Sequence, residues 1–148
     1  MTVDSLAAVR TRAPGLQRVA AIGCGCLMAG AAALVAVNDP SAPGSRFPAC
    51  GFHAATGLWC PGCGLTRGTH HLLRGDVVGA LSSNVFTPFV LGAIVTAWVT
   101  WTLTAFGRRV SHPATRIPAW SGPVLATVLV AFGVVRNLPF GWSRALAP

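Results

Sequence analysis

Three long stretches of the chain contain no charged residue and consist mainly of apolar side chains. They are residues 19–37, 85–107 and 117–135, and each ends at an arginine or at a turn-forming segment. A helix needs about 20 apolar residues to cross the hydrocarbon core of a bilayer. Core helices of soluble proteins usually run about 10–14 residues. The pattern therefore predicts three transmembrane helices.

The loop between the first two stretches, residues 38–84, has a different pattern. Its first part is rich in proline and glycine, so we expect that part to be non-helical. A short helix is expected to begin near Cys63 or Gly64 and to run through Leu73. Gly75 is a suitable stop signal after it.

A second short helix is predicted from Val77 to about Ser83, with Asp76 as its N-cap. The expected fold is an all-α membrane protein with three transmembrane helices. A Cys/His-rich loop with short interfacial helices joins the first two. Residues 19–148 form a single membrane domain, and residues 1–18 form a basic N-terminal arm.

Small residues recur at four-residue spacing in the first two spans, which predicts faces for close helix packing. The members are Ala21, Gly25, Ala29 and Ala33 in the first span, and Gly92, Thr96, Thr100 and Thr104 in the second. The threonine hydroxyls are expected to bond across the contact.

Composition supports hydrocarbon as the main solvent of the chain. The sequence is 53% hydrophobic and 9% charged, and its mean hydropathy is +0.61. An average soluble domain is about a quarter charged. The formal net charge of +8 comes from arginine alone. These arginines flank apolar runs instead of forming a patch, which favours a lipid bilayer as the partner and argues against nucleic acid.

The arginines also predict an orientation, because short basic loops stay in the cytoplasm. One group precedes the first span and another follows the second: Arg10, Arg12 and Arg18, then Arg108, Arg109 and Arg116. We therefore expect a cytoplasmic N-terminus and an extracytoplasmic loop at residues 38–84. The first apolar run exceeds the 7–15 residues typical of a signal peptide, so we expect an uncleaved anchor.

The loop concentrates the chemistry of the chain. Cys60-Pro-Gly-Cys63-Gly has the form of a metal-binding knuckle, and Cys50 and His53 repeat the same spacing. Together these residues supply Cys₃His, a complete tetrahedral ligand set for structural zinc. His70 and His71 are alternative ligands.

Two other interpretations of the cysteines stay open. Cys60 and Cys63 form a Cys-x-x-Cys at an expected helix N-terminus, where the helix dipole lowers a thiol pKa and favours redox chemistry. An extracytoplasmic location also favours a plain structural disulfide from Cys50 to one of them.

At these residues the sequence resembles the bacterial membrane-protein family called domain of unknown function 2752. The resemblance rests on Cys-Pro-x-Cys-Gly-x-Thr-Arg at residues 60–67 and extends over about residues 50–137. Within it, Arg136 has two interpretations: it anchors the end of the third span at the membrane interface, or it bonds the loop backbone or Asp76 together with Asn137. Arg67 is expected to clamp loop carbonyls or to bind an anionic headgroup or substrate.

The few ionisable groups favour a non-enzymatic membrane accessory protein over an enzyme. Its loop, fixed by zinc or a disulfide, would present a surface to a membrane-protein partner or to a second copy. The alternatives are a thiol-disulfide oxidoreductase or a metal-dependent hydrolase at the membrane surface, and a lipid-headgroup-binding protein.

Overall fold

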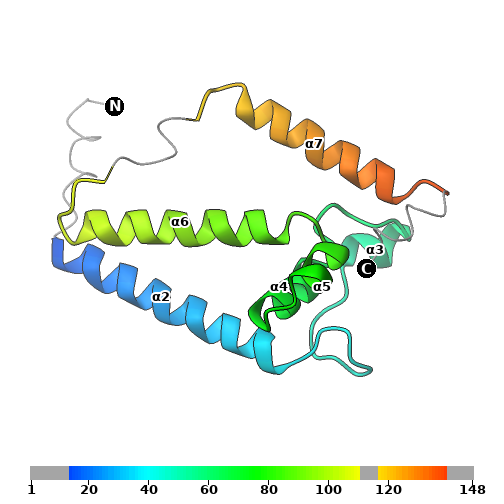
Figure 1. Cartoon of the computed structure of the whole chain (residues 1–148), viewed down its shortest axis with the longest axis horizontal. Coiled ribbons are helices and arrows are strands. Elements are labelled where there is room, and N and C mark those ends of the chain that lie inside the picture. Colours follow the sequence, from blue (N-terminus) through cyan, green and yellow to red (C-terminus); the bar gives the residue numbers. More distant parts are fainter. Residues whose placement is uncertain (1–13, 111–116, 140–148) are drawn as a thin grey trace.

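The computed structural model describes residues 14–110 and 117–139, and within them it contains six helices and no strand. Figure 1 shows their arrangement. The helices are α2 (Pro14–Val37), α3 (Gly51–Thr56), α4 (Leu65–Leu73), α5 (Val77–Ser83), α6 (Thr87–Ala105) and α7 (Ser121–Arg136). The all-helical class is confirmed for these residues. The expected basic arm lies mostly outside them.

Helices α2 and α6 lie side by side and antiparallel (Figure 1). In this contact Trp98 of α6 packs against small residues of α2. Its indole lies where a side chain at Gly25 would be, and its Nε1 donates a hydrogen bond to the carbonyl of Ala21 at 3.0 Å. The small residues predicted on the first span therefore do allow a close approach.

The threonines of α6 do not bond across this contact as expected. The hydroxyl of Thr100 donates to the carbonyls of Thr96 and Ala97 in its own helix, both at 2.9 Å. Thr104 donates to the carbonyl of Trp101 at 2.7 Å. A helical threonine readily reaches the carbonyls three and four residues back. This bond forms within one helix and needs no partner helix.

Helices α4 and α5 form a hairpin that packs at the end of the α2–α6 pair (Figure 1). The N-cap Asp76 accepts from the backbone N–H of Gly79 at 2.8 Å, and Gly75 has φ of 81° between the helices. His70 is buried and joins the hairpin to α2, because its Nδ1 lies 2.7 Å from the carbonyl of Val35.

The core at this junction is small and polar. Gly68 of α4 sits against Thr87 and the backbone of Ala80, with no room for a Cβ. The side chains of Asn84 and Thr87 are fully buried there. Close backbone approach and buried polar side chains therefore join the α4–α5 hairpin to the helix pair, and no large apolar side chain of the described residues is fully buried.

Helix α7 is the largest departure from the expected fold. It begins at Ser121 instead of near residue 117 and has 16 residues. At about 1.5 Å per residue it is about 24 Å long, less than the hydrocarbon thickness of about 30 Å. Two helices, α2 and α6, are long and apolar enough to cross a membrane, and α7 is a shorter apolar helix. Pro118 lies three residues before Ser121, and the residue before a proline is disfavoured in the helical conformation, so the helix does not readily extend back to Ile117.

Helix α7 also stands apart from the other two long helices. Within residues 14–110 and 117–139, no part of it comes close to the backbone of α2 or α6. Its C-terminal end contacts the loop through Arg136 and Asn137. In addition, Phe132 meets Phe86, the N-cap residue of α6, edge to face with centroids 4.9 Å apart.

One short helix was not expected from the sequence. Helix α3 follows Cys50 and ends at Gly57, whose φ of 71° provides a left-handed C-cap. Its six residues are too few for a periodic pattern to be recognised.

Candidate metal centre

The Cys60–Gly64 segment forms a tight turn that directs two sulfurs to one point. The backbone N–H of Cys63 donates to the carbonyl of Cys60 at 3.1 Å, and the N–H of Cys60 lies 3.3 Å from the Cys63 sulfur. Gly64 has φ of 86°, a conformation that favours glycine, and α4 begins directly after it. The turn thus fixes the spacing of Cys60 and Cys63 through the backbone alone.

Helix α3 brings the third sulfur to this turn. The Cys60 Sγ lies 3.0 Å from the Cys63 Sγ and 3.5 Å from the Cys50 Sγ. All three sulfurs are free thiols that lie within 4.8 Å of one another. Tetrahedral zinc with Zn–S of about 2.3 Å separates its sulfurs by about 3.8 Å, so a small outward shift of the side chains would admit such an ion.

The three thiols differ in environment. Cys50 is half-buried, and hydrogen bonding from the backbone N–H of His53, followed by Cys63 and Cys60, lowers its pKa from 9.0 to about 7. Cys63 is 5% exposed, and burial raises its pKa to about 12, with the neighbouring thiols adding to the increase. A bound metal ion deprotonates its thiol ligands outright, so it would override the unfavourable pKa of Cys63.

Two asparagines from distant parts of the chain hold the backbone of the turn. The buried Asn84 donates from Nδ2 to the carbonyls of Pro61 and Cys63, at 2.9 and 3.0 Å. Asn137 pairs with Trp59 in both directions: its Oδ1 accepts from the N–H, and its Nδ2 donates to the carbonyl, each at 2.8 Å. The turn is therefore tied to the start of α6 and to the end of α7.

Arg136 is buried directly beneath the cysteines. Its Nη1 donates to the carbonyls of Cys60 and Cys63, at 3.2 and 3.0 Å, and its guanidinium stacks 5.0 Å from the centroid of Phe132. The residue is 2% exposed, and its Nε and Nη2 have no hydrogen-bond partner among the described residues. A buried guanidinium with unused donors favours negative charge nearby, and the thiols are the groups that can carry it.

The structure does not bring His53 into the sulfur cluster. The group of atoms within 4.8 Å contains the three cysteine sulfurs alone among the described residues. The ring of His53 stacks on Trp59, with centroids 3.9 Å apart, and its Nδ1 lies 3.2 Å from the carbonyl of Leu58. A carbonyl accepts only, so Nδ1 carries the proton in this contact and Nε2 is the free nitrogen. His70 and His71 are occupied elsewhere, on Val35 and on Asp76.

The segment that builds this centre also carries the likeness to known proteins. Residues 50–98 match the model of a family described as "Protein of unknown function (DUF2752)". This segment is therefore similar to that family. The match confirms the predicted resemblance over residues 50–98, and its expected extension to residue 137 stays a prediction. The match assigns no activity, and the bacterial origin and the membrane location also remain predictions. No curated protein and no solved structure matches the chain.

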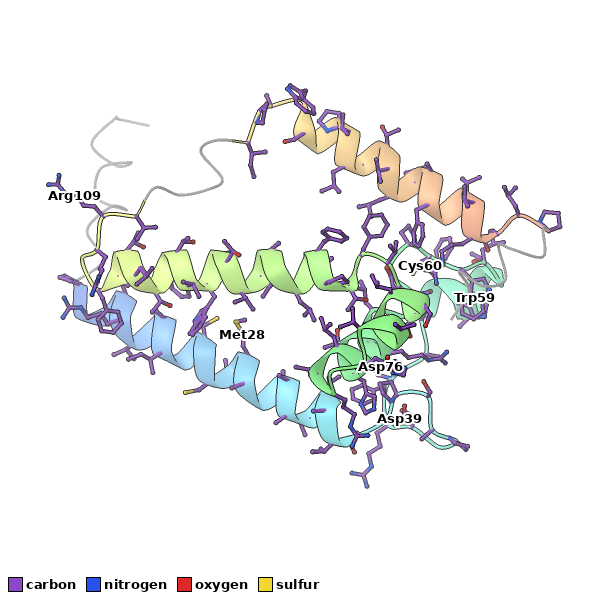
Figure 2. The ribbon with its side chains drawn as sticks, in the orientation of Figure 1. Met28, Asp39, Trp59, Cys60, Asp76 and Arg109 are labelled. Atoms are coloured by element: carbon purple, nitrogen blue, oxygen red, sulfur yellow. The ribbon has the colours of Figure 1, made fainter. Side chains whose placement is uncertain are left out.

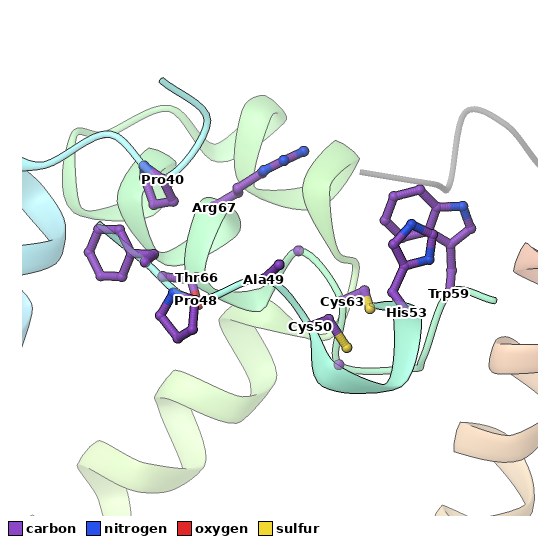
Figure 3. A pocket seen from close by; sticks show the side chains of 12 residues that line it. Pro40, Pro48, Ala49, Cys50, His53, Trp59, Cys63, Thr66 and Arg67 are labelled. Atoms are coloured by element: carbon purple, nitrogen blue, oxygen red, sulfur yellow. The ribbon is translucent and has the colours of Figure 1, made fainter. Parts of the chain in front are cut away.

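The DUF2752 segment also contains Arg67 and Asp76. Arg67 lies on the wall of a pocket of about 400 Å³, which Cys50, His53 and Cys63 also line (Figure 3). Asp76 does not line this pocket, and its carboxylate contacts His71 at 2.9 Å and caps α5. That backbone N–H contact from Gly79, with a further contribution from His71, lowers the pKa of Asp76. Arg136 therefore contacts the loop backbone and not Asp76.

Sequence reasoning gave no role to Asn84 or Trp59. Asn84 fits the family pattern and is the last polar residue before the second apolar run, and these were the only signals for it. Its two carbonyl partners come from the turn more than 20 residues away, at Pro61 and Cys63. No local pattern encodes such a contact.

Proposed function

We propose that the protein is a multi-span membrane accessory protein whose loop is organised by a zinc-type metal centre. Cys50, Cys60 and Cys63 are its protein ligands. The observation that carries the proposal is the convergence of three free sulfurs within 4.8 Å, one of them buried. Thiolate ligands of this kind select soft or borderline metals such as zinc.

Charge balance supports a thiolate centre. A divalent ion with three thiolates carries a net negative charge, and the Arg136 guanidinium lies beside it with two unpaired nitrogens. Without a metal, the buried guanidinium would face neutral thiols and leave its own charge uncompensated. The ion would neutralise thiolate repulsion, and Arg136 would neutralise the remainder.

Surface composition supports the membrane location. Few of the side chains on α2 and α6 are buried, although both helices are strongly apolar. A soluble protein would bury such helices, so hydrocarbon is the environment that fits them. Arg18, which contacts the backbone of Ala105, and Arg109 lie at one end of the pair, with Asp39, Cys60 and Asp76 at the other (Figure 2). This separation agrees with a cytoplasmic arginine end and an extracytoplasmic loop. We propose α7 as a third span, lengthened by the residues before it.

The scarcity of acid–base groups supports a role in binding over catalysis. The carboxylates of the described residues are Asp39 and Asp76, and each is engaged in capping its own turn, with Ser41 and Gly79. Neither lines the pocket at the cysteines. The organised loop would instead present a surface to a membrane partner or to a second copy.

Metal analysis of the full chain, purified in detergent under reducing conditions without chelator, tests this proposal. A single zinc ion per chain is expected. Cobalt substitution is expected to give a sulfur-to-metal charge-transfer band that Cys63→Ser weakens strongly. Cys24→Ser is the matched control, because Cys24 lies in α2 outside the cluster, and it should leave the band unchanged.

A chain that binds neither zinc nor cobalt when fully reduced would overturn the metal proposal. Isolation of the chain with a disulfide among the three cysteines, and no metal uptake after reduction, would assign the cluster to disulfide chemistry instead.

A further inference from the structure

The three-cysteine centre leaves one position of a tetrahedral metal without a protein ligand. Zinc sites that are purely structural take four ligands from the protein, whereas sites that act on a ligand keep one position open. Among the described residues, the only ligand atoms that come together here are the sulfurs of Cys50, Cys60 and Cys63. His53 is turned to Leu58 and stacked on Trp59.

The open side of the cluster faces a pocket. Cys50 and Cys63 lie on its wall, and its volume of about 400 Å³ lies in the range of about 300–1,000 Å³ usual for small-molecule sites. Pro40, Phe47 and Pro48 give the wall an apolar part (Figure 3). The pocket is therefore large enough for a ligand with a short hydrocarbon segment.

Arg67 gives the pocket its charge preference. It is half-buried on the pocket wall, and no carboxylate of the residues that the structure describes lines this pocket. Arg136 already offsets the charge of the thiolate centre from beneath. The charge of Arg67 thus remains available for a ligand, and a guanidinium is well suited to bind a carboxylate.

We propose that the fourth metal position is occupied by a small exogenous thiol that carries a carboxylate. Its thiol releases its proton to solvent and binds the metal as a thiolate, the ligand type that the three cysteines already supply. Its carboxylate lies toward Arg67, and its hydrocarbon part contacts the apolar wall. This inference rests on the metal centre proposed above. It names the class of ligand that the centre takes.

The experiment uses the cobalt-loaded full chain in detergent, with the ligand-field bands of cobalt as the readout of its fourth ligand. Mercaptopropionate is the probe, and mercaptoethylamine is the matched thiol of equal length and opposite charge. Mercaptopropionate is expected to shift the bands at saturable concentration and to bind more tightly than mercaptoethylamine. Arg67→Gln is expected to weaken mercaptopropionate binding by about tenfold, in line with loss of a charge-assisted hydrogen bond.

Arg74→Gln is the control variant, because Arg74 is an exposed arginine close to the same helix that does not line the pocket. It should leave both affinities unchanged. Equal affinity of the two thiols, or equal effects of Arg67→Gln and Arg74→Gln, would overturn the proposed ligand class. Bands that no thiol changes but that His53→Ala changes would assign the fourth position to His53. That result would overturn this inference and leave the metal centre intact, whereas absence of cobalt binding would overturn the metal centre itself.

Discussion

Individual side chains at the cysteine turn act mainly through the backbone. Asn84, Asn137 and Arg136 each contact carbonyl groups of residues 59–63 and none donates to a sulfur in the described structure. Backbone carbonyls are strong acceptors, and leaving one unpaired in a buried turn is costly. The geometry of the three sulfurs is therefore set by polar residues that would not themselves bind metal.

Arg136→Ala should loosen this turn. The change removes two hydrogen bonds from a charged donor, and bonds of that kind contribute about 1.5–3 kcal/mol each to stability. We expect the alkylation rate of Cys63, which is 5% exposed, to rise by at least about tenfold, since about 1.4 kcal/mol of easier opening corresponds to that factor. Mass spectrometry of the metal-free reduced chain would measure the rate.

Arg108→Ala provides the control for this prediction, because Arg108 is exposed and lies near the opposite end of the helix pair. It should leave the Cys63 rate unchanged. An Arg136→Ala chain with the parent rate would show that Arg136 does not hold the turn.

The elements of the loop depend on caps more than on buried apolar surface. Helices α3, α4 and α5 have six, nine and seven residues, lengths that are marginal for helices in isolation. The glycines at positions 57, 64 and 75 supply the left-handed conformations at their ends, and Asp76 supplies a side-chain cap. Local stability of the hairpin should therefore respond to the charge of Asp76.

Asp76 should make the stability of the hairpin depend on pH in the acid range. The Gly79 N–H, and then His71, hold the folded-state pKa of Asp76 below its ordinary value of 3.8. The stabilisation is therefore complete above pH 3.8 and is lost as the pH falls through the lower folded-state pKa. Asp76→Asn should keep the cap and flatten this part of the pH profile, measured as the thermal unfolding midpoint in detergent.

Asp76→Ala removes both the cap and the charge, so its comparison with Asp76→Asn separates the two effects. It should lower the midpoint across the whole pH range, whereas the asparagine variant differs from the parent mainly in the slope. A parental slope in Asp76→Asn would assign the acid sensitivity to other groups.

The whole molecule separates its polar chemistry from its apolar helices. Asp39, Cys60 and Asp76 of the loop lie at one end of the α2–α6 pair, and Arg109 lies at the other end (Figure 2). Arg136 contacts the backbone of Cys60 at the first end, and Arg18 contacts the backbone of Ala105 at the second. Helix α7 contacts the loop through its C-terminal residues and diverges from α6 toward its own N-terminal end (Figure 1). The proposed membrane orientation therefore predicts which end of the helix pair a membrane-impermeant reagent reaches in intact cells.

A cysteine-free chain with single introduced cysteines tests that orientation. Pro43→Cys, in the loop, should react with a membrane-impermeant maleimide in intact cells. Arg109→Cys and Ile117→Cys should react only after the membrane is permeabilised. All three positions are exposed in the structure, so burial in the protein would not explain a lack of reaction.

Reaction of all three positions in intact cells would contradict a membrane-spanning arrangement. The opposite pattern would place the loop in the cytoplasm.

The sequence by itself determined the helical class, the apolar runs that became α2 and α6, and the α4–α5 hairpin with its cap and glycine stops. These features depend on periodicity, composition and turn residues within a few positions of one another. The Cys-x-x-Cys turn is equally local, and the family resemblance followed from it. Proximity of Cys50 to this turn was expected from spacing, and the structure brings the three sulfurs together.

Only the tertiary structure decided which side chains surround the sulfurs. The contacts of Asn84, Arg136 and Asn137 with the turn join residues separated by 21 to 78 positions. The departure of His53 from the cluster depends on stacking against Trp59. The position of α7 and the pocket between the cysteines and Arg67 likewise depend on how separate segments pack. Such contacts arise from three-dimensional packing, which no periodicity along the chain records.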